Sequence, residues 1–87
     1  MNFLHYDFQL NSGDVVEVTL NTVANVRLLD PTNFAYYTNN RKYKFVGGLA
    51  QPPLFTISPP SKGHWHVVID LTGLPGAVNA SVKVIRN

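Results

Sequence analysis

Hydrophobic and polar residues alternate along most of this chain, which is the period-two pattern of half-buried β-strands. The clearest run covers residues 63–71, whose apolar face consists of Trp65, Val67, Ile69 and Leu71. The opposite face of the same run carries His64, His66, Val68 and Asp70. Because tryptophan offers a very large apolar surface, we predict that this run is the central strand of the core, with Trp65 buried.

The same alternation recurs in six shorter stretches, and residues typical of turns separate most of them. These predicted strands are residues 4–10, 15–20, 24–29, 42–46, 54–58 and 78–84. Asn21-Thr22 is interpreted as a tight hairpin connection, and Gly47-Gly48 as the end of a strand or a bulge. Prolines at 52–53 and 59–60 confine the strand between them to a sheet edge, because proline lacks the amide hydrogen that a central strand needs.

Residues 30–38 break this alternation. Asp30 is a good helix N-cap, and Pro31 is favoured at the first helical position. Phe34 and Tyr37 are three residues apart and share one side of a turn. We therefore predict a short helical turn over residues 31–38 that caps an end of the sheet.

About seven short strands with one helical turn indicate an all-β fold. The pattern is typical of a small antiparallel β-sandwich or partly open barrel. With 87 residues, no internal repeat and no linker-like stretch, we expect a single domain over residues 1–87.

The composition limits the kinds of partner. Only 14% of the residues are charged, the formal net charge is +2, and the basic residues cluster only at Arg41, Lys42 and Lys44. Nucleic-acid binding usually needs a broader basic stripe, so we do not expect a nucleic-acid partner. The chain has no cysteine for disulfides or thiolate metal sites. Without a signal-peptide pattern or an apolar run of about 20 residues, we expect a cytoplasmic protein with no membrane partner.

The histidine face of residues 63–71 is the nearest approach to a chemical site. If the strand at residues 4–10 lay beside it, three imidazoles and a carboxylate could surround a zinc ion. The candidate ligands are His5, His64, His66 and Asp70, and Asp7 shares the face of His5. Since the chain lacks a recognisable ligand motif, we expect His64 and His66 to be exposed, hydrogen-bonding side chains, and we predict no metal and no cofactor.

Residues 36–45 form the best candidate for a binding surface. Tyrosine supplies a large contact area at low entropic cost, asparagine adapts its hydrogen bonds, and arginine is enriched at interfaces. The candidate binding residues are Tyr36, Tyr37, Asn39, Arg41, Lys42 and Tyr43. Two alternatives stay open: base stacking between the tyrosines, and a purely structural role in which the aromatic residues close one end of the core.

Several stretches together resemble a small bacterial family without an assigned activity, the domain-of-unknown-function family numbered eighteen eighty-three. They are residues 3–7, 13–18, 24–30, 33–34 with Tyr37, 47–48, 63–71 and 80–82. The resemblance implies a compact β domain, found alone or joined to Toll/interleukin-receptor-like signalling domains. It also implies a sensing or recruiting part in bacterial defence, and it brings no catalytic residues to this chain.

These observations favour a non-catalytic binding module, a sensor or adaptor whose partner is a protein or a small molecule. A structural subunit that self-assembles into homo-oligomers through its edge strands is the alternative. A metal-dependent hydrolase built on His64 and His66 is a third. Because an 87-residue sandwich has little room for a deep cleft, and no serine lies in a nucleophile-elbow pattern, we do not predict an enzyme.

Overall fold

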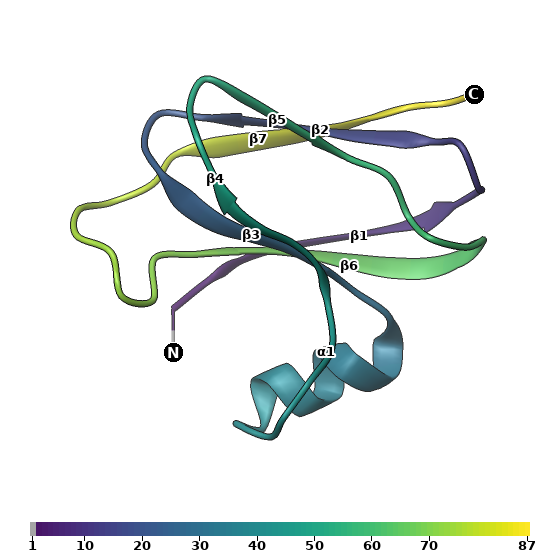
Figure 1. The fold of residues 1–87 in the computed structure, drawn as a ribbon, viewed down its shortest axis with the longest axis horizontal. Helices are drawn as coiled ribbons and strands as arrows, with labels where there is room; N and C mark the ends of the chain where they lie inside the picture. The colour runs from purple at the N-terminus through teal and green to yellow at the C-terminus, as the bar shows by residue number, and fades with distance from the viewer. Residues whose placement is uncertain (1) are drawn as a thin grey trace.

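Seven strands form two antiparallel sheets that face each other in the computed structural model, which describes residues 2–87 (Figure 1). The four-stranded sheet has the order β1-β6-β3-β4, and the three-stranded sheet has the order β5-β2-β7. The strands are β1 (Leu4–Leu10), β2 (Val15–Leu20), β3 (Ala24–Leu29), β4 (Val46–Ala50), β5 (Leu54–Ile57), β6 (Gly63–Asp70) and β7 (Ala80–Ile85). The sheets do not close on each other, so the predicted all-β sandwich is confirmed and the barrel alternative is not.

The core lies between the inner faces of the two sheets, as the alternation predicts. β6 is an interior strand, and Trp65 on its inner face is only 8% exposed. The indole nitrogen of Trp65 donates a hydrogen bond to the carbonyl oxygen of Ser61 at 2.9 Å, which satisfies its one polar group. Fully buried partners come from β1, β2, β3, β4 and β6: Leu10, Val16, Val18, Ala24, Val26, Leu28, Ala50, Val67 and Ile69.

The fourth strand is shifted from its predicted place. Residues 42–45 lie outside any strand, and β4 instead contains Gly47 and Gly48. The amide of Lys44 donates to the side-chain oxygen of Asn33 at 2.7 Å, which draws this stretch to the helix. Gly47 pairs with Arg27 on β3, where a Cβ atom at position 47 would stand 2.3 Å from the carbonyl oxygen of Val26. Gly47 therefore permits a close strand pairing that the alternation does not reveal.

The predicted hairpin at Asn21-Thr22 is wrong, because β2 and β3 belong to different sheets. The amide of Asn21 donates to the carbonyl oxygen of Asn79, and the amide of Asn79 donates to the Asn21 side chain at 2.7 Å. These bonds tie Asn21 to the segment before β7, so the chain crosses from one sheet to the other there. The prolines place β5 correctly, at an edge of the three-stranded sheet.

The predicted helical turn is confirmed as α1 (Pro31–Thr38), and Asp30 caps it by accepting a hydrogen bond from the amide of Asn33 at 2.7 Å. The helix does not cap an end of the sheet. It packs on the outer face of the four-stranded sheet, where Tyr37 is buried with Leu29 of β3 and Val68 of β6 (Figure 1). Within residues 2–87, no helix has the length and apolar character needed to cross a membrane.

We predict that Gly47→Ala destabilises the fold by more than about 2 kcal/mol, because Gly47 has φ +117° and its missing Cβ makes room for the Val26 carbonyl. Urea unfolding followed by circular dichroism measures the change. Gly63→Ala is the matched control in β6, where a Cβ would make an ordinary contact of 3.7 Å with Trp65. Equal stability of the two variants would contradict the role given to Gly47.

Candidate functional site

A buried carboxylate organises the outer face of the four-stranded sheet. Asp70, at the end of β6, is 2% exposed and accepts four hydrogen bonds. They come from the Tyr37 hydroxyl at 2.6 Å, the Arg27 Nη1 at 2.5 Å, the Asn25 Nδ2 at 2.9 Å and the Thr72 amide at 3.1 Å. These donors belong to α1, β3 and the loop after β6, so one side chain joins three elements.

The electrostatics of this cluster follow from that geometry. Burial alone raises the pKa of Asp70, but the hydrogen bonds from Tyr37, Asn25, Arg27 and Thr72 outweigh it and lower the pKa to about 2. Burial and the bond to Asp70 raise the pKa of Tyr37 well above its usual range. The cluster therefore holds an ionised carboxylate and a neutral phenol at neutral pH.

Two arginine residues belong to this part of the molecule, and one of them, Arg27, contacts the carboxylate. Arg27 lies over the rings of Tyr37 and Phe45, at 5.9 and 5.4 Å from their centroids. Its Nε is buried and has no hydrogen-bond partner among residues 2–87. Arg41 is exposed and lies 5.1 Å from the ring centroid of Tyr36, and its amide donates to the Tyr36 carbonyl oxygen at 2.9 Å.

Two pockets adjoin the loop between α1 and β4. The first holds about 260 Å³ and is lined by Arg27, Tyr37, Asn40, Arg41, Tyr43, Asp70 and Thr72. The second holds about 430 Å³ and is lined by Asn33, Tyr36, Lys42, Tyr43 and Lys44. Since Tyr43 lines both, the two pockets form one surface, which we call the arginine–tyrosine surface.

Five of the six predicted binding residues line this surface: Tyr36, Tyr37, Arg41, Lys42 and Tyr43. Tyr37 is 3% exposed and bound to Asp70, so its role is largely structural. Asn39 lies outside both pockets, because its amide and side chain both donate to the carbonyl oxygen of Ala35 and close the end of α1.

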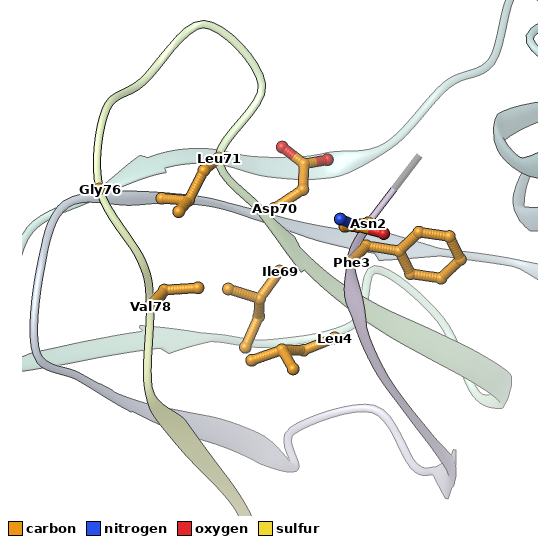
Figure 2. A pocket seen from close by; sticks show the side chains of 8 residues that line it. All are labelled: Asn2, Phe3, Leu4, Ile69, Asp70, Leu71, Gly76 and Val78. Atoms are coloured by element: carbon orange, nitrogen blue, oxygen red, sulfur yellow. The ribbon is translucent and has the colours of Figure 1, made fainter.

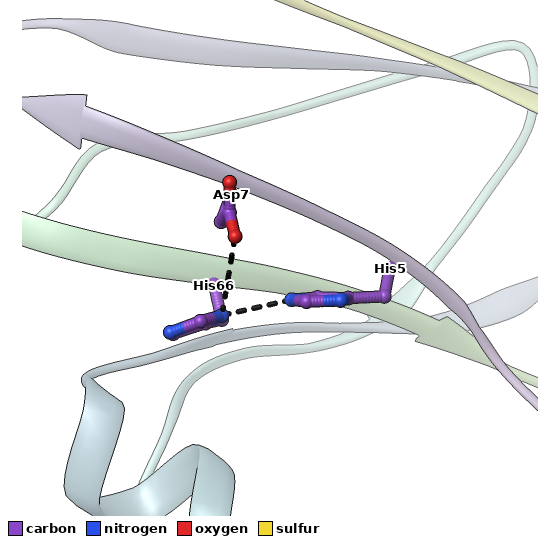
Figure 3. Close-up of side chains that lie close together, drawn as sticks. All are labelled: His5, Asp7 and His66. Carbon is purple, nitrogen blue, oxygen red and sulfur yellow. Dashed lines mark hydrogen bonds and ion pairs between the residues drawn. The ribbon is translucent and has the colours of Figure 1, made fainter.

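The three histidines lie close together on the outer face of β1 and β6, on the other side of the sheet from Trp65. His5 Nε2 and His66 Nδ1 are 2.8 Å apart, and the same His66 nitrogen is 4.0 Å from an Asp7 oxygen (Figure 3). His64 Nε2 is 3.8 Å from that Asp7 oxygen. Burial, together with the neighbouring His5 and His64, holds the pKa of His66 below its usual value. Asp70, the fourth predicted ligand, is occupied by its own cluster and stands apart from this group.

The histidine face is less open than the sequence leads us to expect. Phe34 of α1 stacks on His66 at 4.2 Å between ring centroids and on His5 at 4.4 Å. The side chain of His66 is consequently only 13% exposed, whereas that of His64 is 45% exposed. The predicted exposure therefore holds for His64 and fails for His66, because α1 covers the sheet there, whereas the predicted hydrogen bonding of His66 is met by His5.

A further pocket, of about 370 Å³, lies at the end of the sandwich between the start of β1 and the loop before β7 (Figure 2). Its walls are mainly apolar, with Leu4, Ile69 and Val78 facing one another. Figure 2 shows the Asp70 carboxylate turned away from these three side chains. Because Asp70 is already bound elsewhere, Asn2 is the one remaining polar side chain in the lining, and the pocket offers few anchors for a ligand.

The chain matches the family described as Domain of unknown function (DUF1883) over residues 1–87. It belongs to the DUF1883 family. No curated protein and no solved structure matches the chain.

Six residues line the arginine–tyrosine surface of this DUF1883 chain without being among the predicted binding residues: Arg27, Asn33, Asn40, Lys44, Asp70 and Thr72. One signal was available for Arg27. Arg27 is a charged residue among the apolar residues of β3, and Asp70 is a charged residue at the end of the apolar β6. Opposite charges on two such strands suggest a buried ion pair. The sequence pattern does not tell which strands are neighbours, so the contact between Arg27 and Asp70 is seen only in the structure.

We predict that Tyr37→Phe lowers the free energy of unfolding by about 2 kcal/mol at pH 7, because it removes a hydrogen bond to a charged group and keeps the ring. The folded-state pKa of Asp70 is about 2, below its unfolded value near ~3.9, so this stabilisation is present above about pH 4. It is lost as the pH falls through about 2. Denaturant titrations at pH 7, 4 and 2 measure the effect.

Tyr36→Phe is the matched control, since the neighbouring Tyr36 is only half-buried and its hydroxyl has no partner among residues 2–87. The gap between the Tyr37→Phe variant and the wild-type protein should narrow from pH 4 to pH 2, and the control should show no gap. A gap that persists unchanged at pH 2 would mean that the hydroxyl does not act through the ionised carboxylate.

Proposed function

We propose that this DUF1883 domain is a non-catalytic binding module that recognises an anionic group on a protein or small-molecule ligand through the arginine–tyrosine surface. The observation that carries the proposal is the gathering of cations there. Arg27, Arg41, Lys42 and Lys44 line the two pockets and make up four of the seven Lys and Arg residues of the chain. A small protein with few charges places most of its positive charge on one surface.

The chemistry of this surface suits binding of an anion. The one carboxylate in the pockets belongs to Asp70, and four donors already occupy it. The exposed Arg41 is oriented by the ring of Tyr36, which reduces the entropy that it loses on binding. A guanidinium fork held in this way matches the two oxygens of a carboxylate or phosphate.

Binding, rather than catalysis, is what these groups support. The pockets present guanidinium, ammonium, amide and phenol groups, which donate hydrogen bonds. General acid–base catalysis needs a free group that titrates near the working pH, and the pKa values of Asp70 and Tyr37 are shifted away from neutrality. The surface can therefore hold a ligand without a group placed to transform it.

In this proposal the domain acts as a sensor or adaptor in bacterial defence signalling. The resemblance to a family joined to Toll/interleukin-receptor-like signalling domains supports that setting. A small rigid sandwich with one ligand surface could report the presence of its ligand to a signalling domain in the same assembly.

Self-assembly is a second candidate, favoured by apolar side chains at the free sheet edges. Leu49 of β4 is 57% exposed and Leu54 of β5 is 51% exposed, and both strands are edge strands. Analytical ultracentrifugation over a range of concentrations tests this candidate. Self-association that Leu49→Lys abolishes would support it, and a monomer at every concentration would exclude it.

We predict that anionic probes shift the amide resonances of residues 36–44 and Thr72. The probes are inorganic phosphate, AMP and a glutamate-rich hexapeptide, each titrated into ¹⁵N-labelled protein at low salt. Arg41→Ala should weaken binding of the best probe by roughly fivefold, equivalent to ~1 kcal/mol for an exposed charge. Lys83→Ala is the control, because Lys83 lies on β7 in the opposite sheet.

An equal loss of affinity in both variants would indicate attraction to net charge and contradict a defined site. Resonances that stay in place with all three probes would contradict the anion-binding proposal itself. Charge–charge contacts weaken with ionic strength, so the affinity for the probe should also fall as the salt concentration rises from about 50 to about 300 mM. Over that range the Debye length shortens from about 14 to about 6 Å.

A further inference from the structure

We propose that His5, Asp7 and His66 form a binding site for a divalent transition-metal ion of the zinc class. The site lies on the outer face of β1 and β6 and shares no residue with the arginine–tyrosine surface. The oxygen and nitrogen ligand atoms of these three side chains all lie within 4.8 Å of one another.

Strand pairing creates this convergence. Asp7 stands directly opposite His66 in the β1–β6 register, and His5 precedes Asp7 by two residues on the same face. His66 is thus the direct neighbour of one candidate ligand and the diagonal neighbour of the other. Because the two strands are hydrogen-bonded along their whole length, the sheet fixes the Cα positions of all three residues.

The ligand atoms are close to the separations that a metal ion requires. With bonds of about 2.0–2.1 Å, two ligand atoms of a tetrahedral zinc site are about 3.3 Å apart. The nitrogen atoms of His5 and His66 are 2.8 Å apart, and the His66 nitrogen is 4.0 Å from the Asp7 oxygen. The required separation of about 3.3 Å lies between these two distances, so metal binding calls for adjustments of the side chains that Phe34 has to accompany.

A single nitrogen of His66 faces both partners, as Figure 3 shows. The contact between His5 and His66 requires one ring to donate a proton and the other to offer a lone pair. Moving the donated proton to the other nitrogen of the same ring leaves two lone pairs directed at the space between the rings. A cation then replaces that proton, and no other group has to leave.

Phe34 restricts the two imidazoles to orientations suited to this site. Its ring is stacked on His66 with an interplanar angle of 3° and on His5 with an angle of 16°. Phe3 meets the His5 ring edge-on at 6.4 Å. These aromatic contacts order side chains that would otherwise lose rotamer freedom when a metal binds.

The donor set selects the kind of metal. Two imidazoles and one carboxylate suit zinc and its neighbours in the first transition series, whereas calcium and magnesium prefer oxygen ligands alone. Asp7 is half exposed, so an ion can reach the site from solvent. His64 has its Nε2 3.8 Å from Asp7 but does not belong to the converging set, so a water molecule would fill the remaining coordination position.

Isothermal calorimetry with zinc chloride, at pH 7.5 in a non-chelating buffer, tests the proposal on the whole chain. We expect one zinc ion per chain, reversal by EDTA, and a higher melting temperature with zinc, since the ion binds the folded state. Asp7→Asn and His5→Gln should each weaken binding by more than about tenfold. Imidazole ¹⁵N resonances of His5 and His66 should shift on addition of zinc.

Two controls keep the outcome clear. Glu17→Gln removes a carboxylate from β2 in the opposite sheet and should leave zinc binding unchanged. His64→Gln should weaken binding less than His5→Gln does. Circular dichroism checks that each variant is folded. Asp7→Asn changes a half-exposed side chain, so we expect it to disturb the fold least.

Three results would overturn the proposal. The first is no measurable binding of zinc to the wild-type protein. The second is weak binding of several ions that Asp7→Asn and Glu17→Gln affect equally, which would indicate adventitious surface histidine contacts. The third is loss of binding in His64→Gln with retention in His5→Gln, which would place the metal on other residues.

Discussion

The hydrogen-bonded Asp70 carboxylate is the interaction on which the outer half of this structure depends. A buried carboxylate is costly to desolvate, and only a full set of donors makes it tolerable. Here the donors come from Asn25 and Arg27 on β3, Tyr37 on α1 and the Thr72 amide. Since removal of any one leaves the charge under-compensated, the carboxylate holds α1 against the sheet in one orientation.

That orientation divides the outer face of the sheet into two chemically different regions. Tyr37 and Phe34 face the sheet from the same side of α1, one helical turn apart. Tyr37 stands over Asp70 and borders the cationic surface, while Phe34 stands over the histidines of β1 and β6. An eight-residue helix thus supplies a wall to both regions, although its own apolar contribution to the fold is small.

The sequence predicts the features that depend on local pattern and misses those that depend on which strands meet. Alternation reveals the inner face of β6 with Trp65, and Asp30-Pro31 reveals the start of α1. The shift of β4 escapes prediction because glycine carries no side chain to show an alternation. The pairing of β1 with β6 joins residues about 60 positions apart in the sequence, so no local pattern predicts the contact between His5 and His66.

The two regions are linked mechanically through α1, whatever each one binds. His5 and His66 cannot change their ring planes without moving Phe34, because the three rings are stacked in contact. Phe34 and Tyr37 belong to one short helix whose N-terminus is fixed by Asp30 and whose last turn is fixed by Asp70. A displacement at the histidines is therefore either absorbed by Phe34 alone or transmitted to the Tyr37–Asp70 bond. The Tyr37–Asp70 bond joins a phenol to a buried ion, so stretching it costs more free energy than rotating an exposed imidazole such as that of His64. The helix therefore resists displacement of the stacked histidine rings.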